Sequence, residues 1–286
     1  MERATQPVWP VFLAWVAATV ITLGGSVLVV VAALAVALAR EGPRGIDRLA
    51  QEVATLPVVV VGSVLVSSTT LAVVALVGAK LERRRIADRL HLRFGGRDAA
   101  LVIPGVMLVL GFGQVLDSLA HLLGLMELSA LAEFGEMVHR TSFGWFAALL
   151  VVASIGPGIG EELFFRGYAQ TRLTERWGRW SGIVVASVLF GLLHMDLLHT
   201  PMAFAIGVAL GWLAERAGSI VPGIAVHVVN NAVSFLLLRF LDPAGMTDAT
   251  HALLAGAGFL VGLGGVAAVL VLTRYGSTED HSRGPC

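Results

Sequence analysis

Charge and cysteine are both scarce in this sequence. Only 14% of its 286 residues are charged, whereas roughly 25% are charged in an average soluble domain. Basic and acidic residues number 20 each, so the formal net charge is zero. The basic face that a nucleic-acid partner requires is therefore not indicated. The single cysteine, Cys286, rules out a disulfide within the chain and gives no clue to the redox compartment.

Apolar residues dominate what remains. They make up 56% of the chain, the mean hydropathy is +0.82, and about 20 apolar residues suffice to cross a bilayer. The sequence predicts an all-α, polytopic integral membrane helical bundle of about eight transmembrane helices, forming a single domain over 1–286. N-terminal helices and a basic loop occupy 1–143, core helices 144–241, and a last helix with a tail 242–286. The expected spans are 9–38, 57–79, 100–123, 144–168, 181–198, 201–215, 219–241 and 251–273.

Basic residues indicate the orientation, because cytoplasmic loops of membrane proteins carry an excess of lysine and arginine. The segment 80–98 is predicted to be cytoplasmic and to lie against anionic lipid headgroups. With eight spans, both termini are then cytoplasmic, in the cell membrane. The basic residues of this segment are Lys80, Arg83, Arg84, Arg85, Arg89, Arg93 and Arg97.

The stretch GPGIGEELFFRGY, residues 156–168, places ionisable groups inside the fourth apolar run. Such groups are costly in a bilayer and usually face a functional cavity. Glu162 and Arg166 lie four residues apart, a spacing that favours an ion pair on one helix face. Glu161 points about a quarter-turn away. Pro157 and its flanking glycines are expected to loosen the helix and to open a water-filled pocket beside Glu161.

Three more polar residues lie in later apolar runs. His194 follows FGLL, while His227 and Asn231, four residues apart in HVVNN, project from one helix face. At about 1.5 Å per residue, these three residues and Glu161 lie roughly 12 to 22 Å from the expected cytoplasmic helix ends. They are therefore predicted to converge in one cavity that opens toward the cytoplasm.

This combination suits hydrolysis. A carboxylate shielded from bulk solvent can act as a general base on water, and a histidine can hold the same water molecule. An imidazole and an amide can then donate hydrogen bonds to the oxyanion of a tetrahedral intermediate. His227 and Asn231 are the candidates for that donor pair.

The motifs EELFFR, FGLLH and HVVNN match Glu-Glu-x-x-x-Arg, Phe-x-x-x-His and His-x-x-x-Asn. In this order within a multi-helix membrane protein, they resemble the CPBP family, the CAAX-protease and bacteriocin-processing or ABI group. The resemblance covers about 144–241 and makes that region the expected catalytic core. It implies an intramembrane endopeptidase of the type II CAAX prenyl protease kind, acting on a peptide or membrane-protein substrate.

The resemblance also implies roles for individual residues. Glu161 corresponds to the general base, and His194 to its partner in activating water. His227 and Asn231 correspond to the oxyanion-stabilising pair, with the supporting ion pair formed by Glu162 and Arg166.

Two alternatives remain open. A divalent metal such as zinc could be held by Glu161, His194 and His227, with water as the fourth ligand. The family has been described as both glutamate-dependent and metal-dependent, and the absence of His-Glu-x-x-His favours a site without a cofactor. The second alternative is a non-catalytic transport or immunity scaffold, in which these residues would form a proton or ion relay. The sequence indicates neither the substrate's identity nor an oligomeric state.

Two further features carry no assigned chemistry. Polar residues follow one face of the third span, at Gln114, Asp117, Ser118 and His121. They are predicted mainly to tie helices together, although they could line the same cavity. The segment 126–142 mixes large apolar residues with acids, which is typical of a helix lying in the membrane interface.

Overall fold

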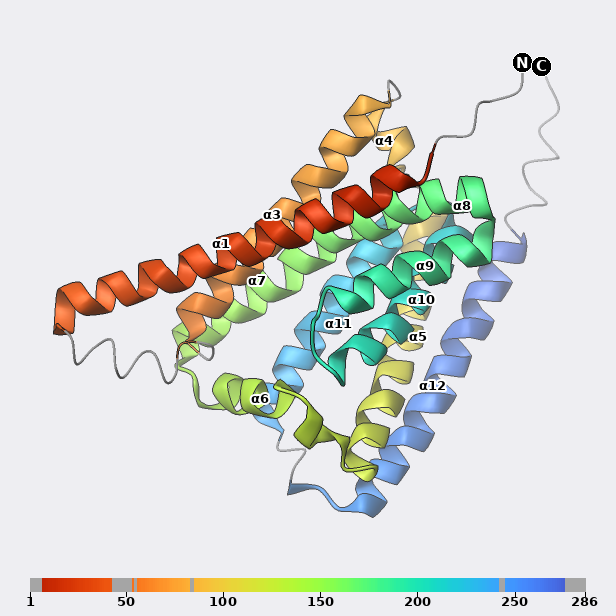
Figure 1. The fold of residues 1–286 in the computed structure, drawn as a ribbon. Coiled ribbons are helices and arrows are strands. Elements are labelled where there is room, and N and C mark those ends of the chain that lie inside the picture. The colour runs from red at the N-terminus through yellow and green to blue at the C-terminus, as the bar shows by residue number, and fades with distance from the viewer. Residues whose placement is uncertain (1–6, 43–52, 54–55, 83–84, 242–244, 276–286) are drawn as a thin grey trace, which may run out of the picture.

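The computed structural model describes residues 7–42, 53, 56–82, 85–241 and 245–275, and the regular structure over these residues is entirely helical (Figure 1). The expected all-α, polytopic class is confirmed. Two long helices, α1 (Trp9–Glu41) and α3 (Pro57–Leu81), pack along the outside. Their contact is reciprocal, because Val66 fills the space beside Gly25 and Val29 that beside Gly62. Small residues allow such close helix approach without a hydrophobic driving force in lipid.

A continuous helical rod forms the centre of the molecule. It consists of α7 (Phe143–Glu161), the π-helix η3 (Glu162–Gln170) and α8 (Thr171–Trp177). Three helices follow, α9 (Arg179–Leu192), α10 (His199–Ala217) and α11 (Val221–Phe240). π-Helical segments are rare and frequent at functional sites. This one begins at the second glutamate of the EELFFR motif.

The glycines of GPGIG serve close packing. A Cβ on Gly158 would overlap Val228 of α11, and one on Gly160 would overlap the backbone of Ser68 in α3. The helix continues through Pro157. Neighbouring helices therefore occupy the surface of these glycines, and the glycines do not form the water-filled pocket expected beside Glu161.

The helices α5 (Gly96–Leu122) and α12 (Asp248–Tyr275) pack closely together. Gly111 meets the backbone of Gly258 and Gly262, leaving no room for a Cβ. At one end of this contact, the rings of His121 and His251 stack with centroids 4.5 Å apart. The polar stripe of α5 thus contacts the neighbouring helix, as the helix-tying interpretation predicts.

Six helical segments of the described residues are long and apolar enough to cross a membrane, not the eight expected. The two discrepancies are the spans predicted at 181–198 and 201–215. They correspond to α9, whose 14 residues reach only about 21 Å of a roughly 30 Å hydrocarbon core, and to α10, which is not among the six. Because two spans are removed from the predicted eight, the number of membrane crossings remains even.

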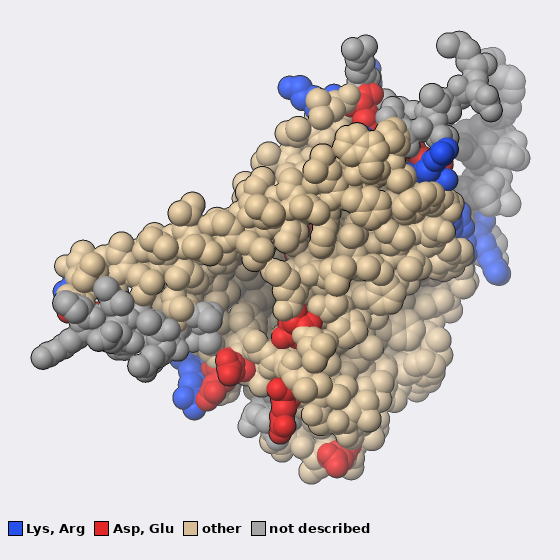
Figure 2. Space-filling model, viewed as in Figure 1, with Lys and Arg blue, Asp and Glu red and all other residues tan. Residues whose placement is uncertain are grey.

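The two ends of the bundle differ in charge. In Figure 2, Lys and Arg gather mainly along the upper and right rim, while acidic side chains follow the lower rim. The lower end carries η2 (Leu125–Leu128) and the amphipathic α6 (Leu131–Arg140), which falls within the interfacial segment expected at 126–142. The upper end carries α4 (Ile86–Arg89) and α8. Arg3, Arg44, Arg48, Arg83, Arg84, Arg283 and Cys286 lie outside the described residues.

Candidate active site

The two glutamates and His227 form the centre of the candidate site. His227 Nδ1 lies 2.9 Å from Glu162 Oε1, and Nε2 lies 3.6 Å from Glu161 Oε2. The side chain of Glu162 is completely buried, and that of Glu161 is 12% exposed. Adjacent carboxylates from the junction of α7 and η3 therefore address the two nitrogens of one imidazole on α11.

Arg166 closes the other side of Glu162. Its Nη1 donates to Glu162 Oε1 at 2.8 Å, and its Nη2 donates to the carbonyl oxygen of Gly207 in α10 at 3.2 Å. Its guanidinium also lies over the ring of Phe190, 4.5 Å from the centroid. A buried charge needs both a partner and hydrogen bonds. The buried Glu162 and Arg166 provide these for each other.

The contact with Glu162 places a proton on Nδ1 of His227. An ionised carboxylate only accepts hydrogen bonds, so Nδ1 carries a proton that it donates to Glu162. In the neutral ring, Nε2 is then unprotonated and faces Glu161. Holding one ring nitrogen is how proteins select the function of the other. Glu162 therefore does more than the ion pairing predicted from its spacing, because it also orients His227.

Asn231 has a backbone partner on α7 that its motif did not indicate. Its Nδ2 donates to the carbonyl oxygen of Ala153 at 3.3 Å, and its Oδ1 accepts from Asn230. In an α-helix, Ala153 would bond to the N–H of residue 157, but Pro157 has none. Asn231 thus satisfies the carbonyl that the proline leaves free, and this fastens α11 to α7.

His194 lies two residues beyond the end of α9. Its Nδ1 is 3.0 Å from the carbonyl oxygen of Phe190, and its ring is 5.1 Å from that of Phe190, centroid to centroid. Phe190 also touches His227, with centroids 6.0 Å apart. Among the described residues, no hydrogen bond or ion pair joins His194 to Glu161. The structure therefore connects His194 to the carboxylates through Phe190 and His227.

His199 is a neighbour that no motif indicated. Its ring centroid lies 4.3 Å from that of His194. The pKa of His199 is lowered to about 4, mainly by burial and also by the adjacent His194, while Asp196 opposes the shift. This ring is therefore neutral near pH 7. The signal available in the sequence was a second histidine close to FGLLH.

The alternative metal site is not assembled. Zinc needs ligand atoms about 2.0 to 2.3 Å from one point. No group of three His, Cys, Asp or Glu side chains in the described part of the chain is arranged to hold a metal ion. Glu161, His194 and His227 as placed do not fit such a site, so no step is derived through a metal.

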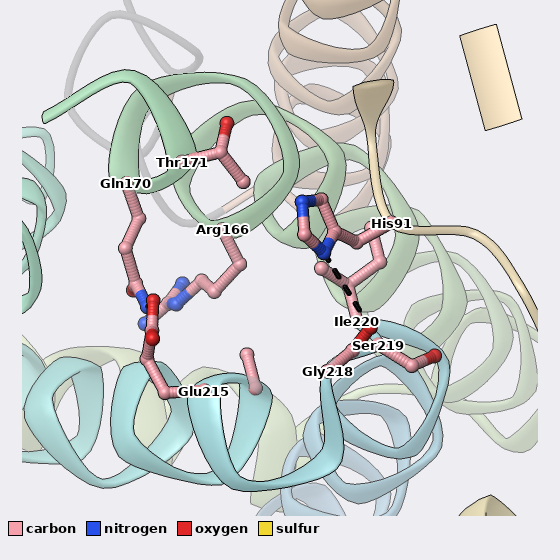
Figure 3. Close-up of a pocket in the computed structure, with 9 residues that line it drawn as sticks. His91, Arg166, Gln170, Thr171, Glu215, Gly218, Ser219 and Ile220 are labelled. Atoms are coloured by element: carbon pink, nitrogen blue, oxygen red, sulfur yellow. Dashed lines mark hydrogen bonds between the residues drawn. The ribbon is translucent and has the colours of Figure 1, made fainter. Parts of the chain in front are cut away.

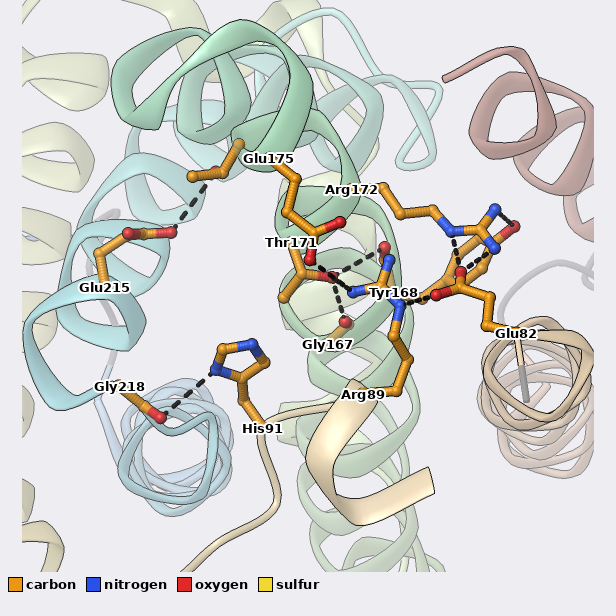
Figure 4. Close-up of polar contacts among 11 residues, drawn as sticks. Glu82, Arg89, His91, Gly167, Tyr168, Thr171, Arg172, Glu175, Glu215 and Gly218 are labelled. Atoms are coloured by element: carbon orange, nitrogen blue, oxygen red, sulfur yellow. Dashed lines mark hydrogen bonds and ion pairs between the residues drawn. The ribbon is translucent and has the colours of Figure 1, made fainter. Parts of the chain in front are cut away.

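One arginine of the basic segment is folded against the helical rod instead of lying on headgroups. Arg89 is buried, pairs with Glu82, and donates to Thr171 Oγ1 at 2.8 Å (Figure 4). Arg172 pairs with the same Glu82 and donates to the hydroxyl of Tyr168 at 2.9 Å. The expected headgroup contact is therefore wrong for Arg89, because Glu82 and the rod compensate its charge.

Residues 85–97, hereafter the strap, also cross the turn between α10 and α11. The carbonyl of His91 accepts from the N–H of Ile220 at 3.0 Å, and Arg97 donates to the carbonyl of Ala217 at 3.2 Å. Gly167 of η3 packs against Leu90, where a Cβ would be only 3.2 Å from the carbonyl oxygen. The strap thus fixes the π-helix that carries Arg166.

A small polar cavity lies between the strap, η3 and the α10–α11 turn (Figure 3). The cavity has a volume of about 60 Å³, several times the roughly 10–15 Å³ that one water requires. The side chains of Arg166, Gln170 and Glu215 point into it from opposite sides. The cavity therefore provides space for water against the buried Arg166. The lining residues are His91, Arg166, Gln170, Thr171, Ala214, Glu215, Gly218, Ser219 and Ile220.

Comparison with known proteins assigns this region to a class. Residues 143–233 match the family described as "Type II CAAX prenyl endopeptidase Rce1-like". The matched segment contains all six residues singled out by the motifs. Residues 143–233 are thus similar to the CAAX protease-like, or CPBP, family, in agreement with the resemblance that the ordered motifs predicted.

A particular relative supports the same assignment. The Bacillus subtilis (strain 168) protein named "Putative membrane peptidase YdiL" is 30% identical over 95 residues. The alignment spans 33% of this chain and 38% of the relative, so it covers well under half of either protein. No solved structure matches.

Proposed function

We propose that the chain is an intramembrane endopeptidase that hydrolyses a peptide bond with a water molecule activated by Glu161. One observation carries the proposal. In the region that matches a protease family, Glu161 and Glu162 meet the two nitrogens of His227 at 3.6 and 2.9 Å. Proximity of a carboxylate to an oriented imidazole is the arrangement that general acid–base hydrolysis requires.

The proposed steps follow from these positions. Water gives a proton to Glu161 while its oxygen adds to the carbonyl carbon of the substrate. The C–N bond then breaks as Glu161 returns this proton to the leaving amine. His194, through Nε2, is proposed to hold the attacking water.

The oxyanion is assigned to His227 and Asn231. Nε2 of His227 can donate a hydrogen bond only when the ring carries both protons. The resulting imidazolium would lie between the carboxylates of Glu161 and Glu162. Asn231 has a second amide proton in addition to the one given to Ala153. Such preorganised donors typically contribute about 10²- to 10³-fold to the rate.

We also propose that this hydrolysis uses no metal cofactor. The carboxylate of Glu161, which already lies beside His227, supports this part of the proposal. A peptide or membrane-protein substrate would enter from the bilayer. The strap end and both termini are proposed to face the cytoplasm, on the basis of the charge asymmetry of the loops. The cavity between the strap and Arg166 gives water a route into the molecule from that side.

The test compares membranes carrying the wild-type chain with membranes carrying Glu161→Ala. We expect peptide fragments, detected by mass spectrometry of their new termini, to be present with the wild type and lost with the variant. Glu133→Ala, on the exposed face of α6, is the matched control and should leave the fragments unchanged. Equal fragments from wild type and Glu161→Ala would refute the proposal. Loss of activity with a chelator would instead favour a metal-dependent reaction.

A further inference from the structure

The loop between α9 and α10 is built around Asp196. Its carboxylate accepts from the backbone N–H groups of Leu198 and His199, at 3.0 and 2.7 Å. It also accepts from the hydroxyl of Ser129 at 2.8 Å and the N–H of Ala130 at 3.1 Å. One side chain therefore fixes the start of α10 and ties it to the segment that precedes α6.

Fixing this backbone fixes the ring of His199. Met195, directly after His194, has a positive φ of 48°, an uncommon conformation for a non-glycine residue. It turns the chain back so that His199 reaches His194, with the two ring centroids 4.3 Å apart and the ring planes at 61°. His194 is thus held between two rings, because Phe190 lies 5.1 Å away.

The position of His194 selects one tautomer. A backbone carbonyl only accepts hydrogen bonds, so the 3.0 Å contact with the Phe190 oxygen requires a proton on Nδ1. In the neutral ring, Nε2 then has a free lone pair. A rotation of the ring would break this contact and release the tautomer, and the packed ring of His199 opposes such a rotation.

We infer that His199 is a positioning residue of the candidate site. Its ring holds the His194 imidazole in the orientation in which Nδ1–H donates to the Phe190 carbonyl and Nε2 stays free to accept a proton. What Nε2 does with that lone pair rests on the proposed function. The orientation itself does not, because it follows from the contacts of the described residues alone.

The test uses the full chain in lipid nanodiscs with ¹⁵N-labelled histidine. Imidazole nitrogen shifts distinguish the Nδ1–H and Nε2–H tautomers, and the signals of His194 are assigned by their loss in His194→Gln. We expect the wild type and His199→Phe, which keeps a ring, to show the Nδ1–H form at His194. His199→Ala should instead mix the two forms. His139→Ala, an exposed histidine on α6, is the control.

Cleavage provides the second measurement. Misplacement of a catalytic group by about 1 Å can cost roughly 10²-fold, so His199→Ala should slow fragment production roughly 10- to 100-fold. His199→Phe should restore most of it. If His199→Ala does not fold, His199→Gln removes the ring while keeping a side chain of similar size, and is compared with His199→Phe in the same way.

The outcomes separate the two proposals. An unchanged Nδ1–H tautomer at His194 in the ring-lacking variant overturns the positioning role, whatever happens to cleavage. A tautomer that changes while neither the wild type nor any variant cleaves leaves the positioning role supported and the proposed hydrolysis refuted. A mixed tautomer together with unaltered cleavage overturns the link between His199 and the reaction.

Discussion

At the scale of single residues, Glu162 links the candidate site. It accepts from Arg166 on one side and from His227 on the other, both at Oε1. The spacing of EELFFR predicts the first contact, because residues four apart share a helix face. The second could not be predicted, since it joins residues 65 positions apart and depends on how α11 packs against the rod. The same limit applies to His199, whose partner lies across a loop.

Removing Arg166 should therefore damage stability more than loss of one contact suggests. Arg166→Met leaves Glu162 buried without its guanidinium, and breaking a buried ion pair in this way costs about 3–5 kcal/mol. The double variant Arg166→Met/Glu162→Gln removes both charges and should recover part of that loss. Thermal unfolding in detergent measures both variants.

The exposed pair of Arg140 and Glu136, with side chains 77% and 59% exposed, is the matched control. Arg140→Met should cost less than about 1 kcal/mol, as expected for a surface pair. A double variant no more stable than Arg166→Met would contradict a charge imbalance at Glu162.

At the scale of elements, the rod through α7 and η3 departs most from the sequence prediction. Its apolar length was readable, because hydropathy acts locally, but the loosening expected near Pro157 is not present, since the helix continues through that residue. The π-helix over 162–170 and the close packing of Gly158 and Gly160 were not readable, because they depend on neighbouring helices. Similarly, α9 was predicted to be a full span from its hydropathy, whereas its length is set by where Asp196 turns the chain.

The interaction between Pro157 and Asn231 can be measured directly. Asn231→Leu leaves the Ala153 carbonyl without its donor, which should cost about 1–3 kcal/mol. Pro157→Ala restores an N–H that can donate to the Ala153 carbonyl from four residues along the helix. In that background, the loss of stability caused by Asn231→Leu should be smaller by about 1 kcal/mol or more, the size of coupling expected for groups that share a partner. Thermal unfolding of the wild type, both single variants and the double variant forms the complete cycle. Strictly additive effects would show that Asn231 does not act through Ala153.

At the scale of the whole molecule, opposite ends of the bundle fasten different parts of the site. The strap binds η3 and the α10–α11 turn at the basic end, while Ser129 and Ala130 bind the loop of His194 toward the acidic end. With six spans and a hairpin of α9 and α10, the strap and the end of α12 share one side (Figure 1). The segment 123–142 lies on the other. The even parity predicted from hydropathy survives because both miscounted helices belong to one hairpin.

This topology is testable with cysteine labelling, since Cys286 is the chain's only cysteine. In a Cys286→Ser background, Arg93→Cys places a thiol on the strap, where the native side chain is 77% exposed. Glu133→Cys places one on the exposed face of α6. A membrane-impermeant maleimide should label Glu133→Cys in intact cells but not Arg93→Cys, and the pattern should reverse in inverted vesicles. The wild-type chain, labelled at Cys286, should follow Arg93→Cys. Labelling of both engineered cysteines from one side would contradict an odd number of crossings between the strap and α6, and with it the proposed cytoplasmic approach to Arg166.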